Sequence, residues 1–305
     1  MNAATPFWNN RRKRSCADAA TSIVFIIPTA ILLIAFVIIP IIWTVQISFN
    51  EWDGLQPTMN FVGLENYQTA FQKPQFQKSL LNNFIWAVMH LFFACGTGFF
   101  IAFLISRLKR GMGFFRTVLF LPNVIATTIS AVMWTQIFNP TYGILNNLLS
   151  AIGLDSLALQ WLADPDLVIY STSMASCWQA YGYYMVLFLA GLQNIDVSLY
   201  EAARMDGANA FKQFIHVTIP GLRSILTFVI SMALINGLKG FATVWAMTRG
   251  GPEYSSHLLS LFVYKTAFLE YDYGLASAAA VILGILVMVI TIAFNVFSDK
   301  INADM

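Results

Sequence analysis

Seven polar or aromatic side chains stand within long apolar segments of the sequence. They are Asn123, Thr127, Trp178, Gln179, Tyr181, Tyr184 and Asn236. Asn123 and Thr127 are four residues apart, so in a helix they would share one face. Amides and hydroxyls can exchange hydrogen bonds with a hydroxylated ligand, and aromatic faces can stack on its C–H groups. The chemistry indicated is reversible binding, in which no covalent bond is made or broken.

Some of these residues also have a purely structural interpretation. Trp and Tyr gather at membrane–water interfaces, and this could account for Trp134, Trp245 and part of the run from Tyr181 to Tyr184. Asn236 could form a hydrogen bond between helices. Lys239, near the end of an apolar segment, is expected to extend its ammonium group to the surface.

Motifs for covalent or metal chemistry are missing from the sequence. It contains no G-x4-G-K-[ST], no HExxH and no G-x-S-x-G, and its three histidines, His90, His216 and His257, are widely separated. The three cysteines form neither a disulfide framework nor a CxxC pair. Only His90 and Lys239 are ionisable within the predicted spans, which argues against an ion-coupled secondary transporter. A membrane-embedded enzyme is equally disfavoured.

Composition places the chain in a membrane. Of its 305 residues 58% are hydrophobic and 10% are charged, whereas soluble domains carry about 25% charged residues. Apolar runs long enough to cross a bilayer recur six times. These predicted spans are Ile23–Ile47, 82–105, 117–138, 168–192, 222–246 and 275–297. The fold class predicted is therefore an all-α integral membrane protein with six transmembrane helices.

Six spans place both termini on the same side, and the positive charges identify that side. Of the 17 Lys and Arg residues, only Lys73, Lys78, Arg249 and Lys265 fall in loops opposite the termini, and Lys239 falls within a span. This excess predicts cytoplasmic termini. We expect residues 1–20 to form a cytoplasmic tail with the basic cluster Arg11–Arg14, and residues 21–300 to form one transmembrane domain.

Residues 198–220 lie between two spans but have the pattern of two short helices. Ser198 and Glu201 have the spacing of a capping box. Gly207 is expected to end the first helix in a left-handed conformation. The second helix would carry Phe211, Phe214 and Ile215 on one face and end at Pro220. A loop with this much structure indicates a surface presented to another protein.

This loop resembles the EAA motif of permease subunits in binding-protein-dependent ABC importers. The family pattern is roughly EAA-x2-DGA-x5-F-x2-I-x-LP. The matching residues here are Glu201, Ala202, Ala203, Asp206, Gly207, Ala208, Phe214 and Pro220, with Val217 and Ile219 as conservative departures. Two further segments, Phe61–Tyr67 (FVGLENY) and Thr248–Pro252 (TRGGP), resemble the carbohydrate branch of the family and occur in the same order.

The resemblance implies a type I ABC importer permease with a cytoplasmic coupling loop, here 196–221. It implies that the loop docks on an ATPase through Glu201, Ala202 and Ala203, with Asp206 and Gly207 shaping the turn. The implied partners are a second homologous permease, two ATP-binding ABC subunits, a soluble substrate-binding protein and membrane lipid, with no nucleic acid. No cofactor belongs to this chain, because ATP and Mg would be bound by the ATPase subunits. The implied location is the bacterial or archaeal inner membrane.

By the same resemblance, the seven polar and aromatic residues match regions that line the sugar site of maltose-type importers. The implied function is import of a sugar or oligosaccharide. In the fifth span this chain has Ala233, Gly237 and Gly240 where that type carries small polar residues. A polyol or glycerophosphodiester permease would have the same fold and loop. A strongly anionic ligand would favour several cationic groups in the path. Only Lys239 is available, which favours a neutral sugar as the substrate.

Overall fold

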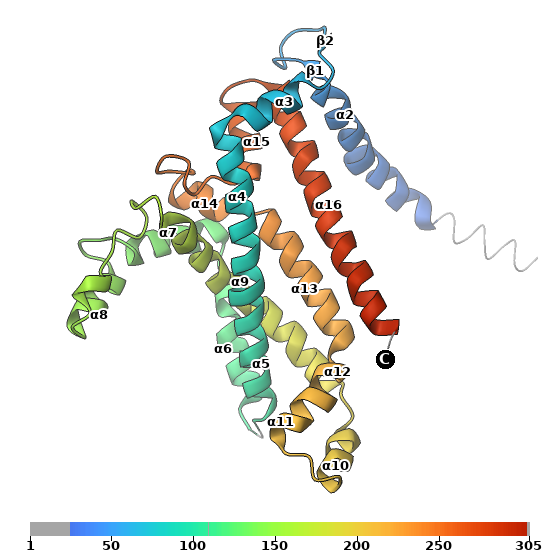
Figure 1. The fold of residues 1–305 in the computed structure, drawn as a ribbon, viewed down its shortest axis with the longest axis vertical. Coiled ribbons are helices and arrows are strands. Elements are labelled where there is room, and N and C mark those ends of the chain that lie inside the picture. The colour runs from blue at the N-terminus through green and yellow to red at the C-terminus, as the bar shows by residue number, and fades with distance from the viewer. Residues whose placement is uncertain (1–24, 109, 304–305) are drawn as a thin grey trace, which may run out of the picture.

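The structure is a computed structural model that describes residues 25–108 and 110–303 (Figure 1). The described chain folds almost wholly into helices, with one two-stranded sheet. The predicted tail 1–20, its basic cluster and Cys16 lie outside the described residues.

Four described helices are long and apolar enough to cross a membrane. They are Phe25–Ser48, Pro74–Ser106, Arg223–Met247 and Tyr273–Ser298. A fifth crossing is added if α6 (Met112–Val124) and α7 (Thr127–Ile137), bent by 92° to each other, count as one span. A mostly helical membrane protein is thus confirmed, whereas the predicted number of six spans stays a prediction.

Most of these crossings contain more than one helical element. The first includes η1 (Ile34–Ile38) and α2 (Ile39–Ser48). The second begins at Pro74, earlier than predicted, because proline suits the first turn of a helix. It contains α4 (Pro74–Met89), the π-helical η2 (His90–Cys95) and α5 (Gly96–Ser106). The later crossings contain α13 (Arg223–Leu238) with α14 (Ala242–Met247), and α16 (Tyr273–Ala303).

The middle of the molecule is organised around α9 (Val168–Gln193), which contacts α4, η2, α5, α6 and α13. This helix is long enough for a crossing, but its Ser, Thr, Gln and Tyr residues keep it out of the strongly apolar set. Two glycines allow its close packing. A Cβ added to Gly98 would lie 2.8 Å from the Tyr181 carbonyl oxygen, and one on Gly182 would lie 2.8 Å from the Leu119 carbonyl oxygen. Gly182 thus lets α9 approach α6 closely.

We predict that Gly98→Val separates α5 from α9 and destabilises the protein by about 1–3 kcal/mol, the usual cost of overpacking. Gly96→Val is the matched control, because it lies in the same helix and nothing lies within 4 Å of its added Cβ. Thermal unfolding of both variants in detergent measures the difference. Equal melting temperatures for the two would contradict the close approach.

The third predicted span is not one straight helix. Ile125 and Ala126 are extended, with ψ of 134° at both, so α6 ends at Val124 and α7 starts at Thr127. Asn123 and Thr127 therefore do not share a helix face, contrary to the prediction. The freed carbonyl of Ile125 accepts a hydrogen bond of 2.6 Å from Gln179 Nε2 on α9. A side chain from a neighbouring helix thus supplies the bond that the interrupted helix lacks.

A second break separates α13 from α14 at residues 239–241. Here Asn83 Nδ2 on α4 donates to the Leu238 carbonyl at 2.7 Å. The Gly240 carbonyl accepts from the Ser260 hydroxyl on α15 (Leu259–Phe268). The two breaks lie on the same side of the molecule, because α14 packs against α7.

One end of the molecule carries the sheet and several short elements (Figure 1). Strands β1 (Asn50–Glu51) and β2 (Asn60–Phe61) pair antiparallel, with Asn50 opposite Phe61. The Asn66 amide, on α3 (Glu65–Gln72), donates to the Ser48 and Asn50 carbonyls at 3.0 and 2.9 Å. Elsewhere in the chain, α8 (Ile144–Ala151) and η3 (Asp155–Leu157) follow α7.

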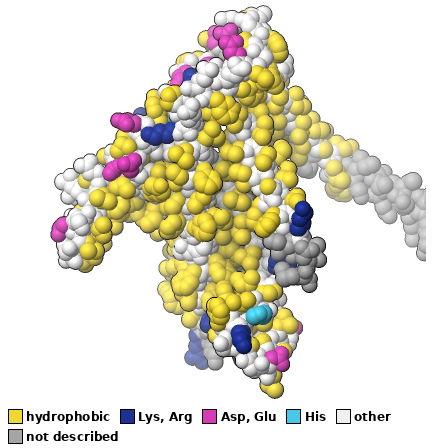
Figure 2. Space-filling model, viewed as in Figure 1, with side chains coloured by type: hydrophobic (Ala, Val, Ile, Leu, Met, Phe, Trp, Pro, Cys, Tyr) yellow, Lys and Arg dark blue, Asp and Glu magenta, His cyan; other side chains and the backbone are white. Residues whose placement is uncertain are grey.

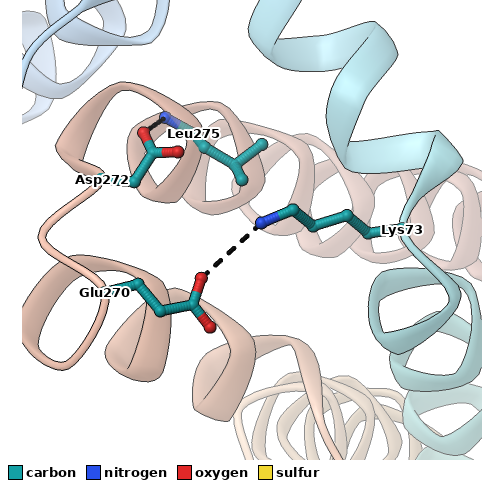
Figure 3. Close-up of polar contacts among 4 residues, drawn as sticks. All are labelled: Lys73, Glu270, Asp272 and Leu275. Atoms are coloured by element: carbon teal, nitrogen blue, oxygen red, sulfur yellow. Dashed lines mark hydrogen bonds and ion pairs between the residues drawn. The ribbon is translucent and has the colours of Figure 1, made fainter.

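Charged groups also fasten the start of α16 at this end. Lys73 Nζ lies 3.6 Å from a Glu270 carboxylate oxygen, and Asp272 accepts from the Leu275 backbone N–H at 3.0 Å (Figure 3). Lys73 is half-buried and Glu270 is exposed, so solvent screens the pair and it adds little stability. The Asp272 bond caps the first turn of the helix.

The loop 249–258, between α14 and α15, is buried against α4 by polar contacts. Asn82 Nδ2 donates to the carbonyls of Ser255 and His257 at 3.0 and 2.9 Å. His257 is 2% exposed, and its Nδ1 lies 2.9 Å from Ser79 Oγ. Burial, with the nearby Lys265 ammonium, lowers the pKa of His257 to about 4. The loop is thus built around a neutral imidazole.

We predict that stability falls in acid because of His257. Its folded pKa lies below the ordinary 6.5, so the unfolded chain takes up the proton first. The stabilisation is complete above pH 6.5 and is lost as the pH falls toward 4. Melting temperatures between pH 7.5 and pH 4.5 should decline less steeply for His257→Gln than for wild type. His216→Gln, at an exposed histidine, is the control, and an unchanged slope in His257→Gln would refute the assignment.

Candidate functional site

A cavity of about 640 Å³ lies between the two helix breaks. Residues 123–127 form one wall and residues 239–243 another, while α4, η2, α9 and α13 provide the rest. No Asp or Glu is among its lining residues in the described chain. Its polar groups are amides, hydroxyls, one imidazole, one indole N–H and one ammonium group. Such a set can hold a polar, uncharged or acceptor-rich molecule by hydrogen bonds.

Four of the seven predicted binding residues line this cavity: Asn123, Thr127, Gln179 and Asn236. Two of them also form hydrogen bonds within the fold. Gln179 supports the carbonyl of Ile125, and Asn123 Nδ2 lies 3.4 Å from the Gln179 carbonyl oxygen. Asn236 is exposed, and its side chain is free to meet a ligand apart from a 3.4 Å contact with the Tyr184 hydroxyl. Their role in binding stays a prediction.

The other three, Trp178, Tyr181 and Tyr184, do not line the cavity. Trp178 packs edge-on against Trp134, with ring centroids 5.6 Å apart. Tyr184 is 1% exposed and sits in the core. Tyr181 is half-buried, and its backbone faces Gly98. Adjacent residues on α9 point in different directions, so a polar and aromatic run cannot face one cavity as a whole.

Sequence reasoning missed the contribution of α4 and η2. Trp86 and His90 line the cavity, and His90 Nε2 lies 3.1 Å from Ser176 Oγ on α9. Lys239 lines the cavity too, and it is exposed, as the sequence interpretation expected. A signal was present, since His90 was one of only two ionisable residues in the predicted spans. Among residues 25–108 and 110–303, no three His, Cys, Asp or Glu side chains gather as metal ligands.

The loop 196–221 forms a second candidate site at the opposite end from the sheet (Figure 1). It contains α10 (Val197–Met205), α11 (Ala210–Gln213), the π-helical η4 (Phe214–Thr218) and α12 (Ile219–Gly221). The predicted Ser198–Glu201 capping box is wrong. Asp196 is the N-cap, because its carboxylate accepts the Ser198 N–H at 2.9 Å, and this bond lowers the pKa of Asp196.

The turn between the loop helices is as predicted. Gly207 has φ of +76°, the left-handed conformation that other residues adopt at a cost. Asn209 then caps α11 by accepting the Lys212 N–H at 2.9 Å. Pro220 does not end the second helix, contrary to the prediction. It stands in the first turn of α12, where a proline needs no N–H partner.

One side of this loop is packed and the other is exposed. Phe214 meets Phe103 on α5 edge-on, with ring centroids 5.2 Å apart. Phe211 was expected on the same face but is 70% exposed, and Met205 is 88% exposed. The motif residues Glu201, Ala202, Asp206, Gly207 and Pro220 are exposed, whereas Ala203 and Ala208 are half-buried. Figure 2 shows hydrophobic side chains over the middle of the molecule, with charged groups mainly outside this band.

We predict that Gly207→Ala loosens the loop by about 1–2 kcal/mol, the cost of a left-handed conformation for an L-residue. Hydrogen exchange of the α10 and α11 amides should accelerate about 5–30-fold. Gly284→Ala is the control, because it replaces a helical glycine of α16 with nothing within 4 Å of the added Cβ. Unchanged exchange in Gly207→Ala would show that the turn carries no such constraint.

A helical membrane domain with two broken helices around a polar cavity, and a structured loop at one end, defines a transport permease. The sequence comparisons give the family. Residues 94–305 match the family described as binding-protein-dependent transport system inner membrane component, and the chain belongs to it. It is therefore an ABC transporter permease subunit of the bacterial or archaeal inner membrane, without enzymatic activity or a cofactor of its own. The resemblance found in the loop is confirmed.

Similar proteins cover nearly the whole chain. The chain is 37% identical to the probable ABC transporter permease protein YurN of Bacillus subtilis, over 90% of this chain and 94% of that one. It is 29% identical to the trehalose/maltose transport system permease protein MalF of Thermococcus litoralis, over 94% and 96%. A crystal structure of a bacterial ABC transporter involved in import of the acidic polysaccharide alginate has the same fold, with a TM-score of 0.82 at 24% identity. That likeness covers 95% of this chain and 99% of that one.

Proposed function

We propose that this chain is the permease subunit of an ABC importer for a sugar or oligosaccharide. The observation that carries the proposal is the 640 Å³ cavity, whose lining combines amides, hydroxyls and aromatic rings without a carboxylate. Relatives named for trehalose and maltose, diacetylchitobiose and starch degradation products support the substrate class. Small polar groups around a largely apolar site are what a saccharide needs for orientation.

The proposed topology has six spans. To the four apolar helices it adds the bent α6–α7 pair and α9, whose polar residues are accommodated because its neighbours bury much of it. Six spans place both termini on one side, and the distribution of Lys and Arg assigns that side to the cytoplasm. The loop 196–221 then faces the cytoplasm, and the sheet end faces outward.

The proposed partners follow from this topology. The exposed face of the loop, with Glu201, Ala202, Met205 and Phe211, would dock on one of two ATP-binding subunits. A second homologous permease would complete the path, and a soluble binding protein would deliver the sugar to the sheet end. A solved alginate transporter in complex with its oligosaccharide-bound periplasmic protein has this fold.

The test is expression of the chain together with its genomic neighbours, followed by reconstitution with the ATPase, second permease and binding protein found among them. We expect co-purification with the ATPase, and ATP-dependent uptake of a radiolabelled sugar from a panel of maltose, trehalose and diacetylchitobiose. Gly207→Pro should lower the ATPase activity that the loaded binding protein stimulates by about tenfold or more, because proline cannot adopt φ of +76°. Gly284→Ala should retain it. Purification without an ATPase, or uptake driven by an ion gradient alone, would refute the proposal.

A further inference from the structure

His90 lies deep in the wall of the cavity. It is the first residue of η2, and π-helical turns of this kind are frequent at functional sites. Its side chain is 4% exposed, and Nε2 lies 3.1 Å from Ser176 Oγ, which also lines the cavity. The pair joins the second crossing to α9 at the level of the two helix breaks.

The imidazole and its neighbour are not fully satisfied. Neither His90 Nδ1 nor Trp86 Nε1 has a hydrogen-bond partner among the described residues. The two rings stack, with centroids 5.8 Å apart and planes 24° apart. A buried polar atom without a partner is costly, and its persistence in a native fold calls for an explanation such as ligand binding.

Two glycines allow the backbone to pack closely against these two residues. A Cβ on Gly240 would lie 2.7 Å from Trp86 Nε1, and one on Gly237 would lie 3.3 Å from His90 Cβ. Gly240 lines the cavity, whereas Gly237 packs behind it against α4. The polar groups beside the two rings come from α9 and from Asn236 and Lys239.

We propose that the His90–Ser176 pair determines sugar specificity by hydrogen-bonding one hydroxyl group of the substrate. The inference rests on the proposed import of a sugar. A hydroxyl both donates and accepts, and the pair can do either, because the proton between Nε2 and Oγ can belong to the imidazole or to the serine. A carboxylate would favour a positively charged ligand. This pair carries no carboxylate, so it distinguishes sugars by where their hydroxyl groups lie.

The experiment compares uptake of the transported sugar with uptake of its monodeoxy analogues, one position at a time. Maltose, trehalose and diacetylchitobiose are the parent probes in the reconstituted complex. In wild type, loss of the recognised hydroxyl should lower uptake efficiency about tenfold, the effect of about one hydrogen bond. In His90→Phe and in Ser176→Ala, the uptake efficiency of the parent sugar should fall by a similar factor. Removing the recognised hydroxyl should then cause no further loss of uptake. Penalties at all other positions should remain.

Ser173→Ala is the matched control. Ser173 lies on the same helix, is fully buried, and donates to the Ile169 carbonyl at 2.6 Å without lining the cavity. It should keep the wild-type pattern of penalties. If His90→Phe and Ser176→Ala keep that pattern too, the pair is only a contact between helices and sugar import still stands. If the wild-type complex moves none of the three sugars and no other mono- or oligosaccharide, import of a sugar and this specificity role are both overturned.

Discussion

The rest of the fold depends on supplying hydrogen-bond donors to the carbonyl groups freed at the two helix breaks. Inside a bilayer no water is available to an interrupted backbone, so each freed group needs a donor from the protein. Gln179 supplies one for Ile125, Asn83 one for Leu238, and Ser260 one for Gly240. The breaks can exist only where helices carrying these side chains stand close by.

This requirement explains why the most polar of the long helices is the central one. If α9 faced lipid, its Ser, Thr and Gln side chains would be costly; among other helices they can bond to backbone and to one another. Close packing at Gly98 and Gly182 brings α5 and α6 within reach of it. The cavity is the space that remains between the breaks. Part of its polar lining, such as Gln179, also forms the hydrogen bonds that stabilise the interrupted backbone.

Sequence reasoning predicted the class of fold, the structured loop 196–221 and its glycine turn, because these depend on local pattern: long apolar runs and the fixed spacing around Gly207. The break after Val124 was missed. No glycine or proline stands at Ile125 or Ala126 themselves. The hints are Pro122, inside α6 just before the break, and a run of β-branched residues with weak helix preference.

The choice of helix cap and of cavity residues could not be settled from local pattern. Asp196 and Ser198 are both good cap residues, and the path of the chain after α9 decides between them. Likewise, Trp178 and Gln179 are adjacent, yet one packs on Trp134 and the other lines the cavity. Which face of α9 is free depends on the neighbours that cover it, and these come from distant parts of the sequence.

The packing of the loop 196–221 limits how a force applied to the loop can be transmitted to the membrane helices. Phe214 is set against Phe99 and Phe103, and Tyr200 bonds to Thr218 across the loop at 3.0 Å. A Cβ on Gly221 would lie 2.9 Å from Ile195, so the two ends of the loop are also in contact. The loop therefore cannot slide over α5 without losing aromatic contacts, and it follows α9 directly in the chain. Because α5 and α9 are packed together at Gly98, a force on the loop moves both helices, and α9 carries Gln179 and Ser176 to the wall of the cavity.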